Sequence, residues 1–176
     1  KDKLLPSLKL LEKELAKKAK EFKNILPIAE KINCKIAIEN HFAFPSDRLA
    51  NIIKLVDEEY LGACLDVANS ICAGEWPDET IDCLKDYTIN LHIKDYQFRI
   101  DPYGVGFSIE GVPLGKGLTN VAGLLSKFKD KDISVIYEHW LPWPGNFEDA
   151  RKNEDIWTTE SIAYLKSLKS EYNQTL

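Results

Sequence analysis

The stretch IAIENH, residues 36–41, is an apolar, strand-forming run that ends abruptly in Glu39, Asn40 and His41. Side chains alternate between the two faces of a strand, so the two isoleucines would share one face and Glu39 would occupy the other. A polar cluster at a strand end is either a solvated turn or a working site. Whether other strands end in the same way decides between them.

Three later runs resemble the first: LGACLDV at 61–67, TINLHIKD at 88–95 and ISVIYEH at 133–139. Apolar residues spaced by three and four between the runs predict helices. The helices are expected at 8–32 (kinked or split by Pro27), from Ser46 to about Glu58, from Pro77 to Lys85, from Thr119 to about Phe128 and from Thr158 to about Tyr172. We expect Ser46 and Thr119 to cap their helices. Residues 96–117 and 140–157 are expected to be long loops.

Strict alternation of helices and strands predicts an α/β fold with parallel strands joined by helical crossovers. In each strand the small or polar face ends in a group that can bind a ligand: Glu39, Asp66, His92 or Glu138. In a closed barrel such faces converge, and the C-terminal rim is where barrel enzymes carry out their chemistry. An open sheet would leave the four groups in a row, so a parallel barrel is favoured.

Three carboxylates and one imidazole gathered at one rim would repel one another unless a cation were present. Oxygen-rich ligation with a single histidine suits Mn²⁺, Mg²⁺ or Co²⁺, with Zn²⁺ as a further possibility. We therefore expect Glu39, Asp66, His92 and Glu138 to bind one divalent metal ion. By the same strand period, Lys94 points inward and is a candidate to bind a substrate hydroxyl or phosphate.

The bulk composition narrows the function classes. The chain has 176 residues and a formal net charge of −5, which disfavours nucleic acid as the main ligand. Its apolar runs are too short to span a membrane, and no signal peptide is recognisable at the start of the sequence. The four cysteines form no C-x-x-C pair, so reduced thiols and a cytoplasmic location are expected.

The motifs IAIENH, GACLDVANS, NLHIKD, GVPLGKG and VIYEH, in this order, resemble the xylose isomerase-like TIM barrels of the sugar-phosphate isomerase and epimerase group. The resemblance covers residues from about 10 to 170. It implies that Glu39, Asp66, His92 and Glu138 are the metal ligands. It also implies that Asn69 faces the substrate and that the glycine-bearing segment contains Gly115 and Gly117. The group includes tagatose- and psicose-type 3-epimerases, hydroxypyruvate isomerases and inosose dehydratases.

The chain departs from that family in length. A complete barrel has eight strands and about 250 residues, whereas four strands are predicted here. The ligand positions are separated by 27, 26 and 46 residues, and the first two intervals match regular βα units. We interpret residues 1–176 as one domain that supplies the C-terminal half of a (β/α)8 barrel. The N-terminal half would then be missing from this sequence or supplied by another chain.

The resemblance implies a mechanism. The metal ion would stabilise an enediolate, while Glu39 and Glu138 move a proton between the faces of a sugar carbon or between neighbouring carbons. Arg99 is a candidate for the arginine that many epimerases carry after the metal histidine, and His41 is a candidate lining residue. The predicted function is thus a metal-dependent sugar or sugar-phosphate isomerase or epimerase.

Several alternatives stay open. DNA-repair phosphodiesterases share this barrel, but they need many histidines and a basic groove, and the sequence has three histidines. A non-catalytic carbohydrate-binding barrel would not need a complete ligand set. A dehydratase could use the same metal site. The expected partner is a small-molecule sugar, without nucleic acid or membrane, and a homo-oligomer is possible.

Overall fold

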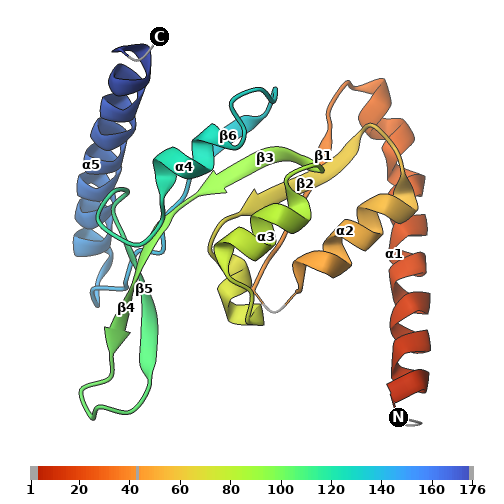
Figure 1. Ribbon diagram of the computed structural model, residues 1–176, viewed down its shortest axis with the longest axis horizontal. Coiled ribbons are helices and arrows are strands. Elements are labelled where there is room, and N and C mark those ends of the chain that lie inside the picture. Colours follow the sequence, from red (N-terminus) through yellow and green to blue (C-terminus); the bar gives the residue numbers. More distant parts are fainter. Residues whose placement is uncertain (1–3, 43, 175–176) are drawn as a thin grey trace. The chain divides into compact units, whose positions relative to one another are not determined.

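The computed structural model describes residues 4–42 and 44–174 (Figure 1). The elements follow in the order α1 (Leu4–Lys31), β1 (Ile36–Glu39), α2 (Ser46–Val56), β2 (Leu61–Asp66), the 3-10 helix η1 (Asn69–Ala73), α3 (Pro77–Leu84), β3 (Thr88–Ile93), β4 (Asp95–Ile100), β5 (Phe107–Val112), α4 (Val121–Ser126), β6 (Ser134–Tyr137) and α5 (Phe147–Gln174). Two compact units can be distinguished. The first contains the residues up to Leu91 together with Asp132–Val135, and the second contains His92–Lys131 and Ile136–Leu176.

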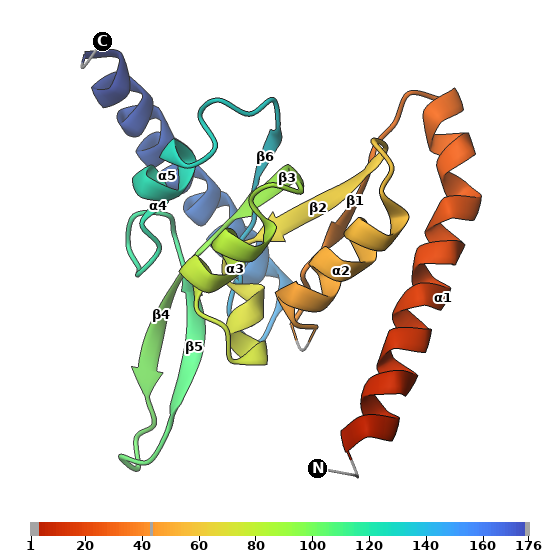
Figure 2. The ribbon, with the colours of Figure 1, turned by 45° about the vertical axis from the view of Figure 1, so that its right-hand side comes forward.

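The four-stranded sheet has the strand order β1-β2-β3-β6, and β1, β2 and the first residues of β3 and β6 belong to the first unit. Strand β1 pairs in parallel with β2, with Ile36 opposite Leu61 and Glu39 opposite Cys64. Helices α2 and α3 lie side by side over β2, and α1 packs against α2 (Figure 2). Every residue of β2 is buried, as expected for a strand covered on both faces. The alternating helix–strand order and the parallel pairing confirm the predicted α/β class.

The interior face of the first unit's sheet follows the predicted alternation. The Cys64 thiol contacts the Asn90 side-chain oxygen at 3.0 Å, and the Asn90 amide donates to the Ser134 hydroxyl. These three residues come from β2, β3 and β6. Each lies an even number of positions before Asp66, His92 or Glu138, and therefore on the same face as that residue. The sequence pattern therefore assigned the strand faces correctly.

The second unit contains a feature that the sequence analysis missed. The predicted loop 96–117 is in large part an antiparallel hairpin of β4 and β5, with Asp95 opposite Val112 and Ile100 opposite Phe107. Its two strands form a long twisted ribbon (Figure 1). Tyr96, Phe98 and Ile100 alternate in period two, which is a strand signal. The glycines and prolines nearby had suggested a loop instead.

The bounds of two helices differ from the expectation. Helix α1 continues through Pro27, so it is not split in two there, and a kink at Pro27 stays a prediction. Helix α5 starts at Phe147, eleven residues before the predicted start, because Asn146 and Asp149 form a reciprocal cap: the Asp149 N–H donates to Asn146 Oδ1 at 2.9 Å. The Asn-x-x-Asp pattern at 146–149 was the available signal.

The caps of α2 and α4 also differ from prediction. Ser46 is the first residue of α2, and its own N–H donates to the Glu75 carboxylate at 3.0 Å, so a distant acidic side chain caps the helix. Asn120, not Thr119, is the N-cap of α4, and its side chain accepts from the Gly123 N–H at 2.9 Å. The Glu75 cap of α2 could not be predicted from the local sequence, because Glu75 lies 29 residues from Ser46.

The helices described here were also compared with the requirements of a membrane span. Within residues 4–42 and 44–174, none combines the length and the apolar character needed to cross a bilayer.

Candidate active site

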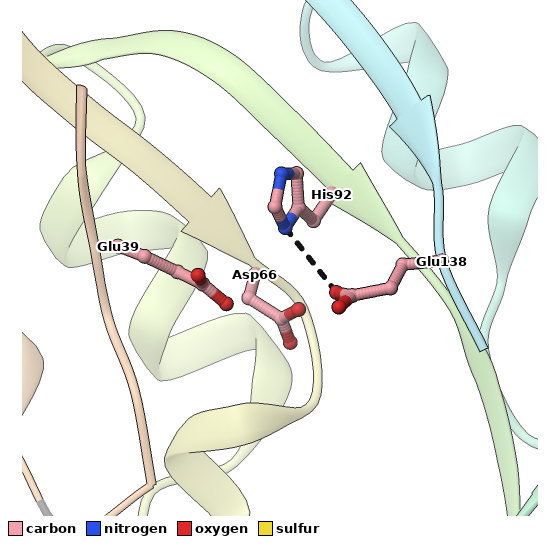
Figure 3. Close-up of side chains that lie close together, drawn as sticks. All are labelled: Glu39, Asp66, His92 and Glu138. Atoms are coloured by element: carbon pink, nitrogen blue, oxygen red, sulfur yellow. Dashed lines mark ion pairs between the residues drawn. The ribbon is translucent and has the colours of Figure 1, made fainter. Parts of the chain in front are cut away.

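The predicted ligands stand at equivalent places in their strands. Glu39 is the last residue of β1 and Asp66 the last of β2. His92 is the penultimate residue of β3, and Glu138 directly follows β6. All four therefore sit at the C-terminal ends of strands that are neighbours in the order β1-β2-β3-β6. Figure 3 draws these side chains.

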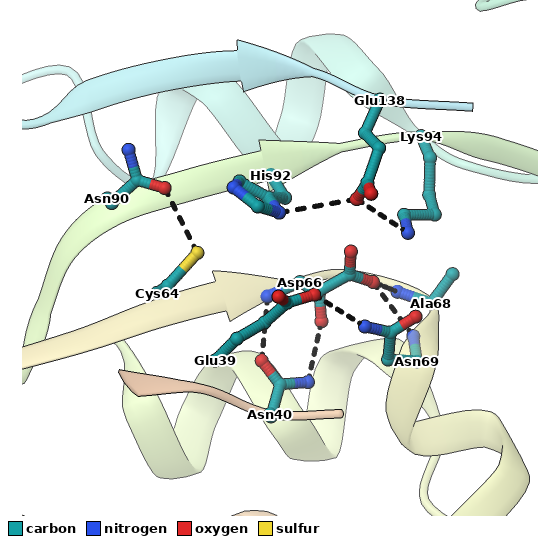
Figure 4. Close-up of polar contacts among 10 residues, drawn as sticks. All are labelled: Glu39, Asn40, Cys64, Asp66, Ala68, Asn69, Asn90, His92, Lys94 and Glu138. Carbon is teal, nitrogen blue, oxygen red and sulfur yellow. Dashed lines mark hydrogen bonds and ion pairs between the residues drawn. The ribbon is translucent and has the colours of Figure 1, made fainter. Parts of the chain in front are cut away.

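In the first unit, a side-chain amide and two backbone N–H groups hold the two acidic groups. Asn69 Nδ2 donates to Glu39 Oε1 at 2.8 Å, and Asp66 Oδ1 accepts from the backbone N–H groups of Ala68 at 2.9 Å and Asn69 at 2.8 Å (Figure 4). Asn69 thus links the two acidic residues. A carboxylate has two oxygens and about four lone-pair sites, so these hydrogen bonds are compatible with metal ligation.

Asn40 was part of the opening motif but received no role in the sequence analysis. It is fully buried, and its side chain joins β1 to β2. Its Oδ1 accepts from the Asp66 N–H at 2.7 Å, while its Nδ2 donates to the Asp66 carbonyl at 2.8 Å and to the Ser70 hydroxyl at 2.9 Å. Asn40 therefore fixes the backbone that carries Asp66. Its position directly after a strand-end acid was the only sequence signal.

In the second unit, Glu138 is held by charged and ionisable partners. Its Oε2 lies 3.2 Å from His92 Nδ1 and 2.8 Å from Lys94 Nζ (Figure 4). The Glu138 N–H donates to the Ile93 carbonyl at 3.0 Å, which registers it beside β3. Lys94 is only 1% exposed, whereas the Glu138 side chain is 45% exposed, so a buried ammonium meets a carboxylate that still contacts solvent.

Aromatic and polar groups surround this second cluster. Lys94 Nζ lies 4.8 Å from the centre of the Trp140 ring, a cation–π arrangement that stabilises a buried ammonium. His139 Nδ1 lies 3.0 Å from the Tyr137 hydroxyl. Burial raises the pKa of Tyr137 above its ordinary value, a hydrogen bond with Ser161 opposes that shift, and the negative charge of Asp95 adds to it. The Tyr137 hydroxyl is therefore protonated at neutral pH.

Two predicted substrate-binding residues are placed differently from the ligands. His41 is exposed and packs edge-on against Phe42, with ring centroids 4.2 Å apart. Arg99 lies on β4 and pairs with Glu110 of β5 at 2.9 Å, where it is two-thirds exposed. Contact of either residue with a substrate stays a prediction, as it does for Asn69 and Lys94.

Comparison with known proteins adds the family. The chain matches the family model described as xylose isomerase-like TIM barrel over residues 6–168. This chain belongs to that family. The resemblance drawn from the motifs is thereby confirmed, and with it the barrel class of the fold.

Individual relatives are similar at different levels. A 3-oxo-isoapionate decarboxylase of Pectobacterium atrosepticum is 34% identical over 143 residues, which is 80% of this chain and 52% of that protein. A xylose isomerase-like TIM barrel protein from Mycobacterium smegmatis in complex with magnesium aligns with a TM-score of 0.60 and 19% identity, over 82% of this chain and 50% of that one. A D-tagatose 3-epimerase-like protein aligns with a TM-score of 0.55 and 24% identity, over 88% and 55%.

The chain thus spans about half the length of the proteins that it matches. Its relatives include sugar-modifying enzymes, and one structural neighbour binds magnesium. Three carboxylates and one imidazole in this chain form a donor set that could bind a divalent metal ion. The interpretation of residues 1–176 as a single domain stays a prediction.

Proposed function

We propose that this chain carries the metal-binding half of a sugar isomerase or epimerase that transfers a proton at a carbon next to a carbonyl group. The observation that carries the proposal is the placement of Glu39, Asp66, His92 and Glu138 at equivalent C-terminal ends of neighbouring strands. Membership of the xylose isomerase-like family supports it.

The proposed ligands are these four side chains. The donor set fits Mn²⁺, Mg²⁺ or Co²⁺ best, because it is rich in oxygen and contains one nitrogen. When bound, such an ion would supply a Lewis acid that stabilises negative charge developing on the substrate oxygens. The hydrogen bonds from Asn40 and Asn69 would keep the first two ligands in place.

Two carboxylates are proposed to move the proton. One of Glu39 and Glu138 removes a proton from the carbon beside the carbonyl, and the electron pair passes to the carbonyl oxygen to give an enediolate. The other carboxyl group returns a proton to the opposite face, which gives an epimer. Return to the neighbouring carbon gives the isomeric aldose or ketose. Lys94 is proposed to hold Glu138 and to bind a substrate oxygen.

A decarboxylase is the second candidate, because the relative that is 34% identical is named as one. In a 3-oxo acid, the bond between the carboxylate and C2, the carbon next to the carbonyl group, breaks. Carbon dioxide leaves, and the electron pair of the broken bond forms an enolate with that carbonyl group. A protonated carboxyl group at Glu39 or Glu138 would then deliver a proton to that carbon. Both candidates therefore share a stabilised enolate and differ in how it forms.

One experiment separates the two candidates. The complete gene product is stripped with a chelator, reloaded with Mn²⁺, Mg²⁺, Co²⁺ or Zn²⁺ and incubated in deuterated water with a panel of ketoses and with 3-oxo sugar acids. Deuterium entering a recovered ketose next to its carbonyl supports the isomerase or epimerase. Release of carbon dioxide from a 3-oxo acid, without exchange into any ketose, supports the decarboxylase. Activity that survives complete metal removal contradicts both.

A further inference from the structure

The Asp95 carboxylate in the second unit accepts four backbone hydrogen bonds. It is fully buried at the first position of β4. Its Oδ1 accepts from the N–H groups of Tyr96 at 2.9 Å and Thr119 at 2.8 Å. Its Oδ2 accepts from Gly115 at 2.9 Å and Gly117 at 2.8 Å. Four backbone donors thus surround one carboxylate, three of them from a segment 20 to 24 residues away.

The segment PLGKGLT at 113–119 owes its shape to this carboxylate. Successive backbone N–H groups turned to one point form an anion-binding nest. Gly115 has a φ of +82°, which side-chain-bearing residues rarely adopt. A Cβ at Gly117 would collide with the Tyr96 carbonyl and with Asp95 Oδ1. The two glycines are therefore spaced to let the backbone close around Asp95, so these N–H groups are already engaged by the chain's own anion.

The nest is tied to Lys94, the residue before Asp95. The Thr119 hydroxyl donates to the Lys94 carbonyl at 2.8 Å, and the Leu118 N–H donates to the Tyr96 carbonyl at 2.9 Å. The backbone on both sides of Asp95 is thus held by the same segment. From this backbone the Lys94 side chain reaches Glu138 at 2.8 Å.

Trp140 completes the arrangement around Lys94. Its ring lies under the ammonium group at 4.8 Å, and its backbone passes so close to Gly111 that a Cβ there would collide with the Trp140 carbonyl. The ammonium is therefore held between a carboxylate and an aromatic face. A shift of the Lys94 backbone would change the distance between Lys94 Nζ and Glu138 Oε2.

We propose that Asp95 and Thr119 are positioning residues: the nest at 113–119 fixes the Lys94 backbone and thereby the ammonium–Glu138 contact. The proposal rests on the proposed function, in which Glu138 binds the metal ion and moves a proton. It also gives a role to the glycine-bearing segment, which the resemblance had identified without assigning one.

Thr119 offers a matched pair of variants. Thr119→Val removes the hydroxyl that donates to Lys94, whereas Thr119→Ser keeps it. Loss of one such hydrogen bond is worth about fivefold in a rate when it acts on the reacting geometry. We expect Thr119→Val to lower kcat about fivefold with little change in KM. We expect Thr119→Ser to have a kcat close to that of the wild-type protein. Equal kcat values in the two variants, with lowered melting temperatures only, would overturn the positioning role.

Asp95 allows chemical rescue. In Asp95→Ala the nest loses its anion, so the Gly115, Gly117 and Thr119 amides should exchange with solvent much faster than in the wild-type protein. Added formate should slow this exchange and recover part of kcat, whereas chloride at the same ionic strength should not. Amides that stay protected without any added anion would refute the nest. If Asp95→Ala does not fold, the comparison of kcat between Thr119→Val and Thr119→Ser still tests the positioning role.

The measurements keep the two proposals apart. Amide exchange reports on the nest without any substrate or metal ion. A wild-type protein that shows this protection but no deuterium incorporation and no decarboxylation would overturn the proposed function alone. A wild-type protein that is active while Asp95→Ala is fully protected would overturn the further inference alone.

Discussion

The two units hold their acidic residues by different means. In the first, the Asn69 amide donates to the Glu39 carboxylate, and the Asn40 side chain exchanges two hydrogen bonds with the Asp66 backbone. In the second, Glu138 is held by Lys94 and lies beside His92. Neutral hydrogen bonds depend on shape and burial, whereas charged contacts respond to the charge of each partner. Substitutions in the first unit should therefore mainly lower the free energy of unfolding, whereas substitutions in the second should mainly lower turnover.

The largest effect is expected at Glu138. Glu138→Gln keeps the size of the side chain but removes the charge and the proton-transfer group, so turnover should fall by about a thousandfold, with modest loss of stability. Glu110→Gln is the matched control, because Glu110 belongs to the same unit and pairs with Arg99 on the hairpin. The measurement is kcat for both variants. Full turnover in Glu138→Gln would contradict its assignment.

The next effect should appear in stability. Asn40→Ala leaves the N–H and carbonyl of Asp66 and the hydroxyl of Ser70 without their buried partner. An unsatisfied buried polar group costs about 1–3 kcal/mol, so the free energy of unfolding should drop by at least that amount in denaturant titrations. Asn51→Ala provides the control, because that asparagine is exposed on α2. An unfolding midpoint like that of the control would show that the amide link matters little.

A smaller change is expected at Asn69. Asn69→Ala removes one donor to Glu39 but leaves the backbone N–H that binds Asp66. Loss of a hydrogen bond to a carboxylate is worth about 1.5–3 kcal/mol at most, and partial exposure of Glu39 reduces it. We expect a several-fold weaker affinity for Mn²⁺ in calorimetric titration and a drop in the free energy of unfolding smaller than that of Asn40→Ala. Unchanged affinity together with a raised KM would instead favour the predicted contact with substrate.

The smallest effect should come from the hairpin pair. Arg99 and Glu110 form an exposed ion pair, worth about 0.2–1 kcal/mol. Alanine at either position, and at both, should change stability by less than 1 kcal/mol in a double-mutant cycle. The same variants test the predicted substrate contact. If Arg99 binds substrate, Arg99→Ala raises KM while Glu110→Ala does not; equal KM values would remove Arg99 from the site.

The sequence was most informative where a side chain's role follows from its own strand. The alternation that put Cys64 and Asn90 on one face is local, and so is the position of Glu39 at a strand end. Asp95 was invisible for the opposite reason, since its donors lie 20 to 24 residues away. Its neighbours in the motif, His92 and Lys94, suggested binding of a metal ion and a substrate, and gave no sign that Asp95 would bind backbone N–H groups.

The elements that were missed share a physical cause. Turn-forming residues near 101–106 dominated the reading of the hairpin, although Tyr96, Phe98 and Ile100 alternate as a strand should. The start of α5 was hidden by Pro and Trp residues that precede its cap at Asn146. In both cases a strong local breaker lay next to a weaker periodic signal. The hydrogen bonds of the hairpin and of the helix cap show which one governs the backbone.

The β4–β5 ribbon has an evolutionary consequence. Its pairing is purely local, from Asp95 opposite Val112 at the base to Ile100 opposite Phe107 at the far end. Strand side chains repeat every two residues, so deleting or adding two residues on each arm would preserve the facing of everything below. The tip can therefore vary in length and composition while the base keeps its register. That makes the ribbon a replaceable module through which related enzymes could diversify without rebuilding their catalytic framework.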